Sequence, residues 1–242
     1  MDREKFGTRL GFILVSAGCA IGIGNVWKFP YMCGQYGGAA FILIYLLFLL
    51  IMGIPILICE FSVGRNSQLG ISVAFDKTEP QGTKWHRLKW IGILGNYLLM
   101  MFYTTVAGWM MYYCYKSIKG DFVGVSTEQV TSAFDEMLGS ASTMAFWMII
   151  VCVVGFWVCA KGLKSGIEKA SKIMMTSLLI IMIALAIRSV FLDGAEAGVR
   201  FYLIPDFAKM AKVGIGNVIF GAMSQAFFTL SIGIGSMHIF GS

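Results

Sequence analysis

Six long apolar runs limit the folds that are open to this chain. They cover residues 10–36, 40–63, 88–115, 143–160, 167–191 and 214–240. A membrane-crossing helix needs about 20 mainly apolar residues, and each run comes close to that length. Because lipid offers no partners to backbone N–H and C=O groups, such runs cross it as helices. Only 13% of the residues are charged, and most of them lie between the runs, so the sequence predicts an all-α membrane protein with six spans.

The Lys and Arg residues indicate how these spans are oriented. They do not form one patch, so the net charge of +6 does not point to nucleic acid as a partner. If the runs alternate across the membrane, twelve of the nineteen basic residues share a side with the amino terminus. This excess predicts a multi-pass protein of the plasma membrane with a cytoplasmic amino terminus. We expect no cleaved leader, because the first run is longer than the apolar part of a signal peptide.

Two of the runs carry glycines that weaken a helix in the middle of the membrane. In the first run Gly22 and Gly24 precede Asn25, and the sixth run contains Gly233 and Gly235. Each glycine costs about 1 kcal/mol of helix stability relative to alanine, and opened backbone must line a polar cavity. Close packing of helices through small residues is the alternative explanation. Two interrupted helices at corresponding positions favour a binding site near the midplane instead.

Several short motifs follow one another along the chain. They are 22–30 (GIGNVWKFP), 37–41 (GGAAF), 53–55 (GIP) with Glu60 and Gly64-Arg65, 166–169 (GIEK), 205–207 (PDF) and 225–231 (QAFFTLS). Together they resemble the neurotransmitter:sodium symporter family, in the bacterial amino-acid transporter branch that includes the bacterial leucine transporter. The resemblance implies the first five-helix repeat of an inverted-repeat transporter core, followed by the broken first helix of the second repeat. The breaks are expected near 22–24 in the first span and near 233–236 in the sixth.

The same resemblance implies sodium and substrate sites. One sodium ion would bind the Ala20 carbonyl, the Asn25 side chain and Thr229, and a second would bind the carbonyls of Gly18 and Ile21. The implied contacts of an amino-acid substrate are Ile23, Gly24, Leu99, Tyr103, Phe227, Phe228, Thr229, Ser231 and Ile234. Ligation by oxygen atoms alone suits a hard cation such as Na⁺.

The resemblance also implies gates and a possible chloride site. Lys28 matches an outer-gate cation, usually arginine, and Arg3 matches an inner-gate arginine. A lysine cannot reproduce the planar fork of a guanidinium group, so a bidentate outer gate is not expected. The positions around a possible Cl⁻ site are Tyr45, Gln225 and Thr229.

Gly22 stands where the monoamine carriers of the family have an aspartate. A glycine leaves room for the carboxylate that an amino acid brings with it. The resemblance therefore favours an amino-acid substrate, with an apolar or aromatic side chain given the lining of the pocket.

The function that these features predict is sodium-coupled symport of an amino acid, with this chain as the amino-terminal part of a transporter embedded in lipid. The family's second repeat is not within the 242 residues, so a carboxyl-terminal half or a partner chain is expected. A half-sized membrane subunit that assembles with a second chain, as carrier or regulatory partner, is the alternative. Without the resemblance, Asn25, Glu60 and Gln225 are also explained as interhelical hydrogen-bonding residues. The sequence has no HExxH, GxSxG or P-loop motif, so no enzyme is expected.

Overall fold

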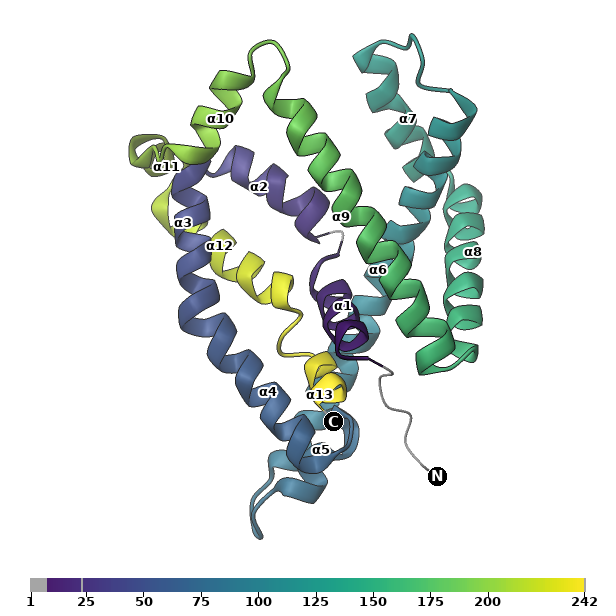
Figure 1. Cartoon of the computed structure of the whole chain (residues 1–242), viewed down its shortest axis with the longest axis vertical. Coiled ribbons are helices and arrows are strands. Elements are labelled where there is room, and N and C mark those ends of the chain that lie inside the picture. Colours follow the sequence, from purple (N-terminus) through teal and green to yellow (C-terminus); the bar gives the residue numbers. More distant parts are fainter. Residues whose placement is uncertain (1–7, 23, 242) are drawn as a thin grey trace. The chain divides into compact units, whose positions relative to one another are not determined.

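A computed structural model of the chain describes residues 8–22 and 24–241, apart from the Lys164 side chain. Its regular elements in these ranges are all helical (Figure 1). Four helical stretches are long and apolar enough to cross a membrane, namely Ala39–Ser67, Trp85–Lys119, Ala141–Ala160 and Ser165–Val190. Two bent helix pairs, Arg9–Ala20 with Gly24–Gln35 and Phe207–Val213 with Ile215–Leu230, bring the number of candidate spans to as many as six.

The helices form two compact units. The first holds the residues up to 93 and those from 168 onward, and the second holds 94–167. The second unit is built from α6 (Leu88–Lys119, which starts in the first unit), α7 (Thr127–Gly139) and α8 (Ala141–Ala160). Within it, the Trp109 ring meets Phe134 of α7 edge-on with 5.7 Å between centroids. The helix α7 lies outside the six predicted runs. A capping box formed by Ser126 and Gln129 stabilises its start.

The first span of the first unit is interrupted. It consists of α1 (Arg9–Ala20), the π-helical η1 (Gly24–Lys28) and α2 (Phe29–Gln35). The Thr8 hydroxyl caps α1 by accepting the backbone N–H of Gly11 at 2.9 Å. Pro30 lies in the first turn of α2, directly after the π-helical η1, and has no N–H to donate to that preceding turn. The parts before and after the break are bent by 54° from each other.

The second span is continuous but contains a widened turn. It runs through α3 (Ala39–Phe48), the π-helical η2 (Leu49–Gly53) and α4 (Ile54–Ser67). Pro55 has no N–H to donate to the preceding turn, which accounts for the local change in helix type. The short helices α5 (Ile71–Thr78) and η3 (Trp85–Arg87) then lead to α6.

The loop between α5 and η3 is tied together by one ion pair. Glu79 Oε1 lies 2.8 Å from His86 Nδ1, and Glu79 Oε2 accepts the His86 backbone N–H at 3.1 Å. Desolvation opposes ionisation of Glu79, but these hydrogen bonds and the charge of His86 outweigh it and lower the pKa of Glu79. The contacts hold the two ends of the loop together outside the apolar spans.

The fifth span and two short helices precede the second break. The span consists of η4 (Leu163–Glu168) and α9 (Lys169–Val190), and α10 (Ala195–Leu203) and α11 (Phe207–Val213) follow it. The Asp206 side chain caps α11 by accepting the backbone N–H of Lys209 at 2.9 Å. Both short helices lie outside the six predicted runs.

The sixth span is interrupted as well. It consists of α12 (Ile215–Leu230), a turn over 231–235 and α13 (Ser236–Gly241). Ser231, Gly233 and Gly235 have φ of 50°, 88° and 76°, a left-handed conformation that cannot continue an α-helix. The turn overlaps the break expected near 233–236, and the left-handed Ser231 ends α12 before the glycines are reached.

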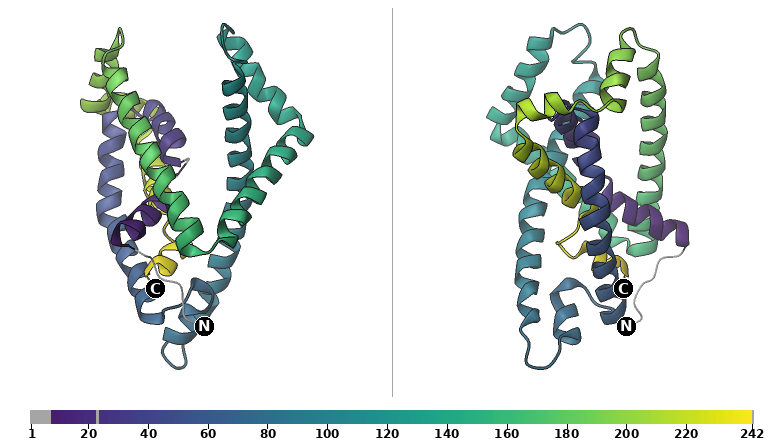
Figure 2. Two further views of the ribbon diagram at one scale, coloured as in Figure 1. Left: turned by 45° about the vertical axis from the view of Figure 1, so that its right-hand side comes forward. Right: turned by 90° about the vertical axis from the view of Figure 1, so that its left-hand side faces the viewer.

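Two close helix contacts position the broken sixth span. The helix α12 packs on α3, where Phe41, Val218 and Ala222 are fully buried. The helix α13 packs on α4, and both views of Figure 2 show the carboxyl end of the chain beside the end of α4. A Cβ added at Gly64 would collide with the backbone of His238, and one added at Gly241 would meet the backbone of Phe61. The absence of side chains at these glycines lets the two backbones touch.

We expect Gly64→Ala to lower the free energy of unfolding by about 1–3 kcal/mol, because the new methyl group has to displace the backbone of α13. Gly155→Ala is the matched control, since no described atom lies within 4 Å of its added Cβ. The control should be neutral or stabilising by up to about 1 kcal/mol, as alanine is the better helix former. Unfolding in mixed micelles titrated with SDS measures both, and equal effects of the two substitutions would contradict the packing described here.

Candidate functional site

The Asn25 side chain connects the two sides of the first break. The helix α1 ends at Ala20, whose carbonyl lies beyond the regular hydrogen bonds of the helix. Asn25 Nδ2 donates to this carbonyl at 2.7 Å. Since Asn25 belongs to η1, one side chain links the end of the helix before the break to the start of the helix after it. The contact brings together two of the residues for which the resemblance implies a sodium site.

Thr229 adds the sixth span to this contact. Its hydroxyl donates to Asn25 Oδ1 at 2.8 Å and accepts from the Tyr45 hydroxyl at 3.0 Å. A chain of hydrogen bonds thus runs from Tyr45 on α3 through Thr229 on α12 to Asn25 and Ala20. The three oxygen-bearing residues implied for one sodium site therefore lie together, and Tyr45, implied for chloride, adjoins them.

Two more side chains from the sixth span bind the opened backbone of the first. Gln225 is fully buried, and its Nε2 donates to the Gly24 carbonyl at 3.0 Å. The Ser231 hydroxyl donates to the Cys19 carbonyl at 2.9 Å. Gln225 was implied for chloride and Ser231 for substrate, and both make backbone contacts across the two breaks. Breaking these bonds would leave buried polar groups unpaired, which costs about 1–3 kcal/mol each.

Glu60 binds the opened backbone of the second break. Its side chain is 7% exposed, and Oε1 accepts the backbone N–H of Gly233 at 2.5 Å. The Ser236 hydroxyl donates to the Ser231 carbonyl at 3.0 Å and closes the same turn. No role in a binding site was expected for Glu60, although an acidic residue within the apolar run 40–63 indicates that it has a partner inside the protein.

Phe228 and Lys28 lie next to the first break. A Cβ added at Gly24 would fall within the Phe228 ring, so this glycine allows the ring to approach the backbone of η1. Lys28 Nζ lies 5.1 Å from the centroid of the same ring, within the range of a cation–π contact. Lys28, the implied outer gate, therefore lies beside Phe228, an implied substrate contact.

The other residues implied for the sodium, substrate and gate positions lie on several elements. Gly18 lies in the last turn of α1 and Ile21 caps it, so both are at the break. Phe227 is on α12 and Ile234 is in the turn at 231–235. Leu99 and Tyr103 lie on the part of α6 that belongs to the second unit. Arg3 and Ile23 fall outside the described residues.

The geometry agrees with what comparisons with known proteins find. The sequence pattern of the sodium:neurotransmitter symporter family matches residues 3–129 and 126–242, which covers nearly the whole chain. The chain belongs to this family. The symporter family consists of sodium-dependent transporters rather than enzymes, which confirms the expectation from the missing catalytic motifs.

Individual relatives and a solved structure fit the same family. The chain is 35% identical over 238 residues to the uncharacterized sodium-dependent transporter YhdH of Bacillus subtilis (strain 168), covering 98% of this chain and 52% of the relative. It is 28% identical over 270 residues to the sodium-dependent neutral amino acid transporter B(0)AT2 of Mus musculus, covering 100% of this chain and 36% of the relative. The crystal structure of MhsT in complex with L-phenylalanine superposes with a TM-score of 0.88 and 38% identity, covering 99% of this chain and 54% of MhsT.

These comparisons confirm the all-α membrane fold of the symporter family and the multi-pass character of the chain. The chain spans about half the length of YhdH and MhsT and 36% of the length of B(0)AT2. The residues that join the breaks lie in that half, on α1, η1, α3, α4, α12 and the turn after it.

Glu60→Leu should loosen the second break, because the Gly233 N–H loses its buried acceptor. We expect hydrogen exchange of the Gly233 amide to quicken by about two- to tenfold, in line with the net contribution of about 0.5–1.5 kcal/mol from one hydrogen bond. Glu60→Gln is the matched control, since its carbonyl oxygen can still accept this bond. Mass spectrometry of peptides that cover 231–235 measures the rates, and equal exchange in the two variants would refute the role of Glu60.

Proposed function

We propose that this chain contributes the first repeat, and the broken first helix of the second, to a sodium-coupled symporter of an amino acid. The observation that carries the proposal is the link from the Ala20 carbonyl through the Asn25 amide to the Thr229 hydroxyl. It joins both broken spans at one point, where an ion bound to one span also contacts the other. Such a site can couple ion binding to a change in the relation of the two helices.

The ligands suit sodium as a transported ion. Ala20 O, Asn25 Oδ1 and Thr229 Oγ1 are neutral oxygens, which hard cations prefer. Asn25 Nδ2 donates to Ala20 O at 2.7 Å and the Thr229 hydroxyl donates to Asn25 Oδ1 at 2.8 Å, so the three residues lie next to one another. A second sodium ion would use the carbonyls of Gly18 and Ile21 at the end of α1. Chloride near Tyr45, Gln225 and Thr229 is part of the proposal as a possible additional ion.

The substrate that we propose is an amino acid with an apolar or aromatic side chain. Its carboxylate would lie in the space that Gly22 leaves, near the sodium ion. The residues proposed to contact it are Ile23, Gly24, Leu99, Tyr103, Phe227, Phe228, Thr229, Ser231 and Ile234. The phenylalanine named for the MhsT complex supports this class of substrate, as does the neutral amino acid named for B(0)AT2.

The proposal includes an orientation and a partner. The amino terminus would be cytoplasmic, as the distribution of Lys and Arg predicts, so that Arg3 lies at an inner gate and Lys28 at an outer one. The second repeat would come from a downstream segment of the same protein. The alternative is a half-sized membrane subunit that obtains this repeat from a second chain, as carrier or regulatory partner, and the half-length match to the relatives fits both.

Asn25→Ala should reduce the stimulation of amino-acid uptake by sodium by about tenfold or more, because the loss of one ion ligand costs at least ~1.5 kcal/mol. Asn217→Ala on the exposed surface of α12 is the matched control and should leave the stimulation unchanged. Uptake of labelled phenylalanine in sodium and in choline buffer measures the effect. Unchanged sodium stimulation in Asn25→Ala would overturn the ligand assignment.

Expression of the chain alone and beside its downstream reading frame separates the two arrangements. We expect sodium-dependent uptake only when both are present, because the residues of the second repeat that complete the proposed site come from the downstream segment. Cells with an empty vector and cells with the downstream frame alone provide the background. Uptake by the 242-residue chain alone would favour assembly with further copies of itself.

A further inference from the structure

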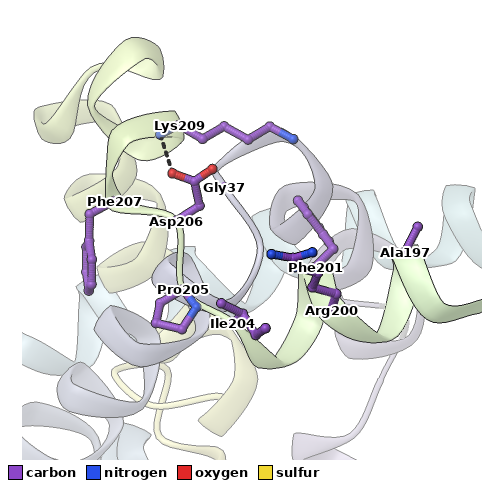
Figure 3. Close-up of a pocket in the computed structure, with 9 residues that line it drawn as sticks. All are labelled: Gly37, Ala197, Arg200, Phe201, Ile204, Pro205, Asp206, Phe207 and Lys209. Atoms are coloured by element: carbon purple, nitrogen blue, oxygen red, sulfur yellow. Dashed lines mark hydrogen bonds between the residues drawn. The ribbon is translucent and has the colours of Figure 1, made fainter.

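A cavity in the first unit is lined by none of the residues that join the two breaks. It has a volume of about 440 Å³ and is formed by the end of α10, the turn that joins it to α11, and Gly37. Figure 3 shows these residues around the turn, with the Lys209 side chain reaching from α11 towards Phe201. The volume falls within the range of pockets that hold small molecules. None of the residues proposed for sodium, substrate or chloride lines it.

The charged groups of this cavity have a positive balance. Arg200 and Lys209 contribute two cations and Asp206 one carboxylate. Asp206 Oδ1 is occupied by the backbone N–H of Lys209, and Lys209 Nζ lies 4.8 Å from the Phe201 ring centroid. Within residues 8–22 and 24–241, no carboxylate lies within 4.0 Å of the Arg200 guanidinium. The guanidinium group is therefore available to an anion.

The other wall of the cavity is apolar and of fixed shape. Ile204 and Phe207 line it, and each is 55% exposed, which is costly in water unless something covers them. Pro205 restricts the turn between the helices, and the Asp206 cap fixes the start of α11. Gly37 also lines the cavity; it has φ of 97°, and a Cβ added there would lie 3.3 Å from the backbone nitrogen of Met210, so a side chain at this position would be strained. The cavity is thus held open by local structure.

We infer that this cavity binds a small organic carboxylate with an apolar body. The planar fork of Arg200 matches a carboxylate with two parallel hydrogen bonds, while Lys209 adds a second positive charge. Ile204, Pro205 and Phe207 cover the apolar part of the ligand. Inorganic phosphate satisfies the cations but leaves the apolar wall in water, so it is the weaker ligand. The site does not depend on sodium and stands apart from the transport proposal.

Equilibrium dialysis of the purified 242-residue chain in nanodiscs, in choline buffer without sodium, tests this inference. The probe is labelled 3-phenylpropanoate, and its neutral amide, 3-phenylpropanamide, reports binding without the charge. We expect saturable binding of the acid at millimolar or lower concentration, and a Kd about tenfold or more higher for the amide. Excess inorganic phosphate should displace the acid only weakly. Asn25→Ala should bind the acid as the native chain does, which separates this site from the transport site.

Three variants locate the site. Arg200→Gln should raise the Kd of the acid by about tenfold or more, and Arg188→Gln, which removes an exposed arginine at the end of α9, should leave it unchanged. Ala197→Trp fills the cavity while all its charges stay in place, and it should also abolish binding. Tryptophan fluorescence and size-exclusion profiles show whether each variant is folded. No saturable binding to the native chain, equal binding of acid and amide, or undiminished binding to a folded Ala197→Trp variant would each overturn the inference.

Discussion

The backbone groups that the two helix breaks set free must find partners within the protein, and this requirement organises the first unit. At membrane depth an unpaired N–H or C=O costs several kcal/mol, and two broken spans release several such groups at once. Side chains supply the partners here: Asn25 for Ala20, Gln225 for Gly24, Ser231 for Cys19 and Glu60 for Gly233. Most of these bonds join segments about 200 residues apart, so each break is stabilised only when distant helices are in place.

Such bonds need backbones that lie close together, and small residues provide the space. Gly24 allows the Phe228 ring to reach the backbone of η1, and Gly64 allows α13 to touch α4. Side-chain hydrogen bonds of 2.5–3.0 Å across the breaks are possible only at these separations. The glycines therefore have two coupled effects. Some weaken a helix, and others allow a neighbouring segment to come close enough for its side chains to bind the backbone groups that the weakened helix exposes.

The same polar groups serve structure and the proposed transport. The amide of Asn25 is at once the brace of the first break and the proposed ligand of a sodium ion. An ion that binds its oxygen competes with the hydrogen bond from Thr229 for the same lone pairs, so occupancy of the site changes how the two broken spans hold each other. Because the bracing contacts are single hydrogen bonds, each of modest net strength, an ion of moderate affinity is sufficient to shift this balance.

The sequence by itself determined the class of the molecule and indicated which two spans carry helix-weakening glycines. Long apolar runs can only be helices in lipid, and glycines beside polar residues mark weak points, since both effects are local properties of a segment. The proposed site residues came from the resemblance of the motifs to the symporter family, which no local physical rule contains. Tertiary structure decided the partners: that Glu60 holds Gly233, that Ser231 rather than a glycine ends α12, and that Arg200 faces a cavity beside Ile204. The bond between Glu60 and Gly233 depends on the packing of α13 on α4, which joins segments 173 residues apart, so no local window of sequence contains it.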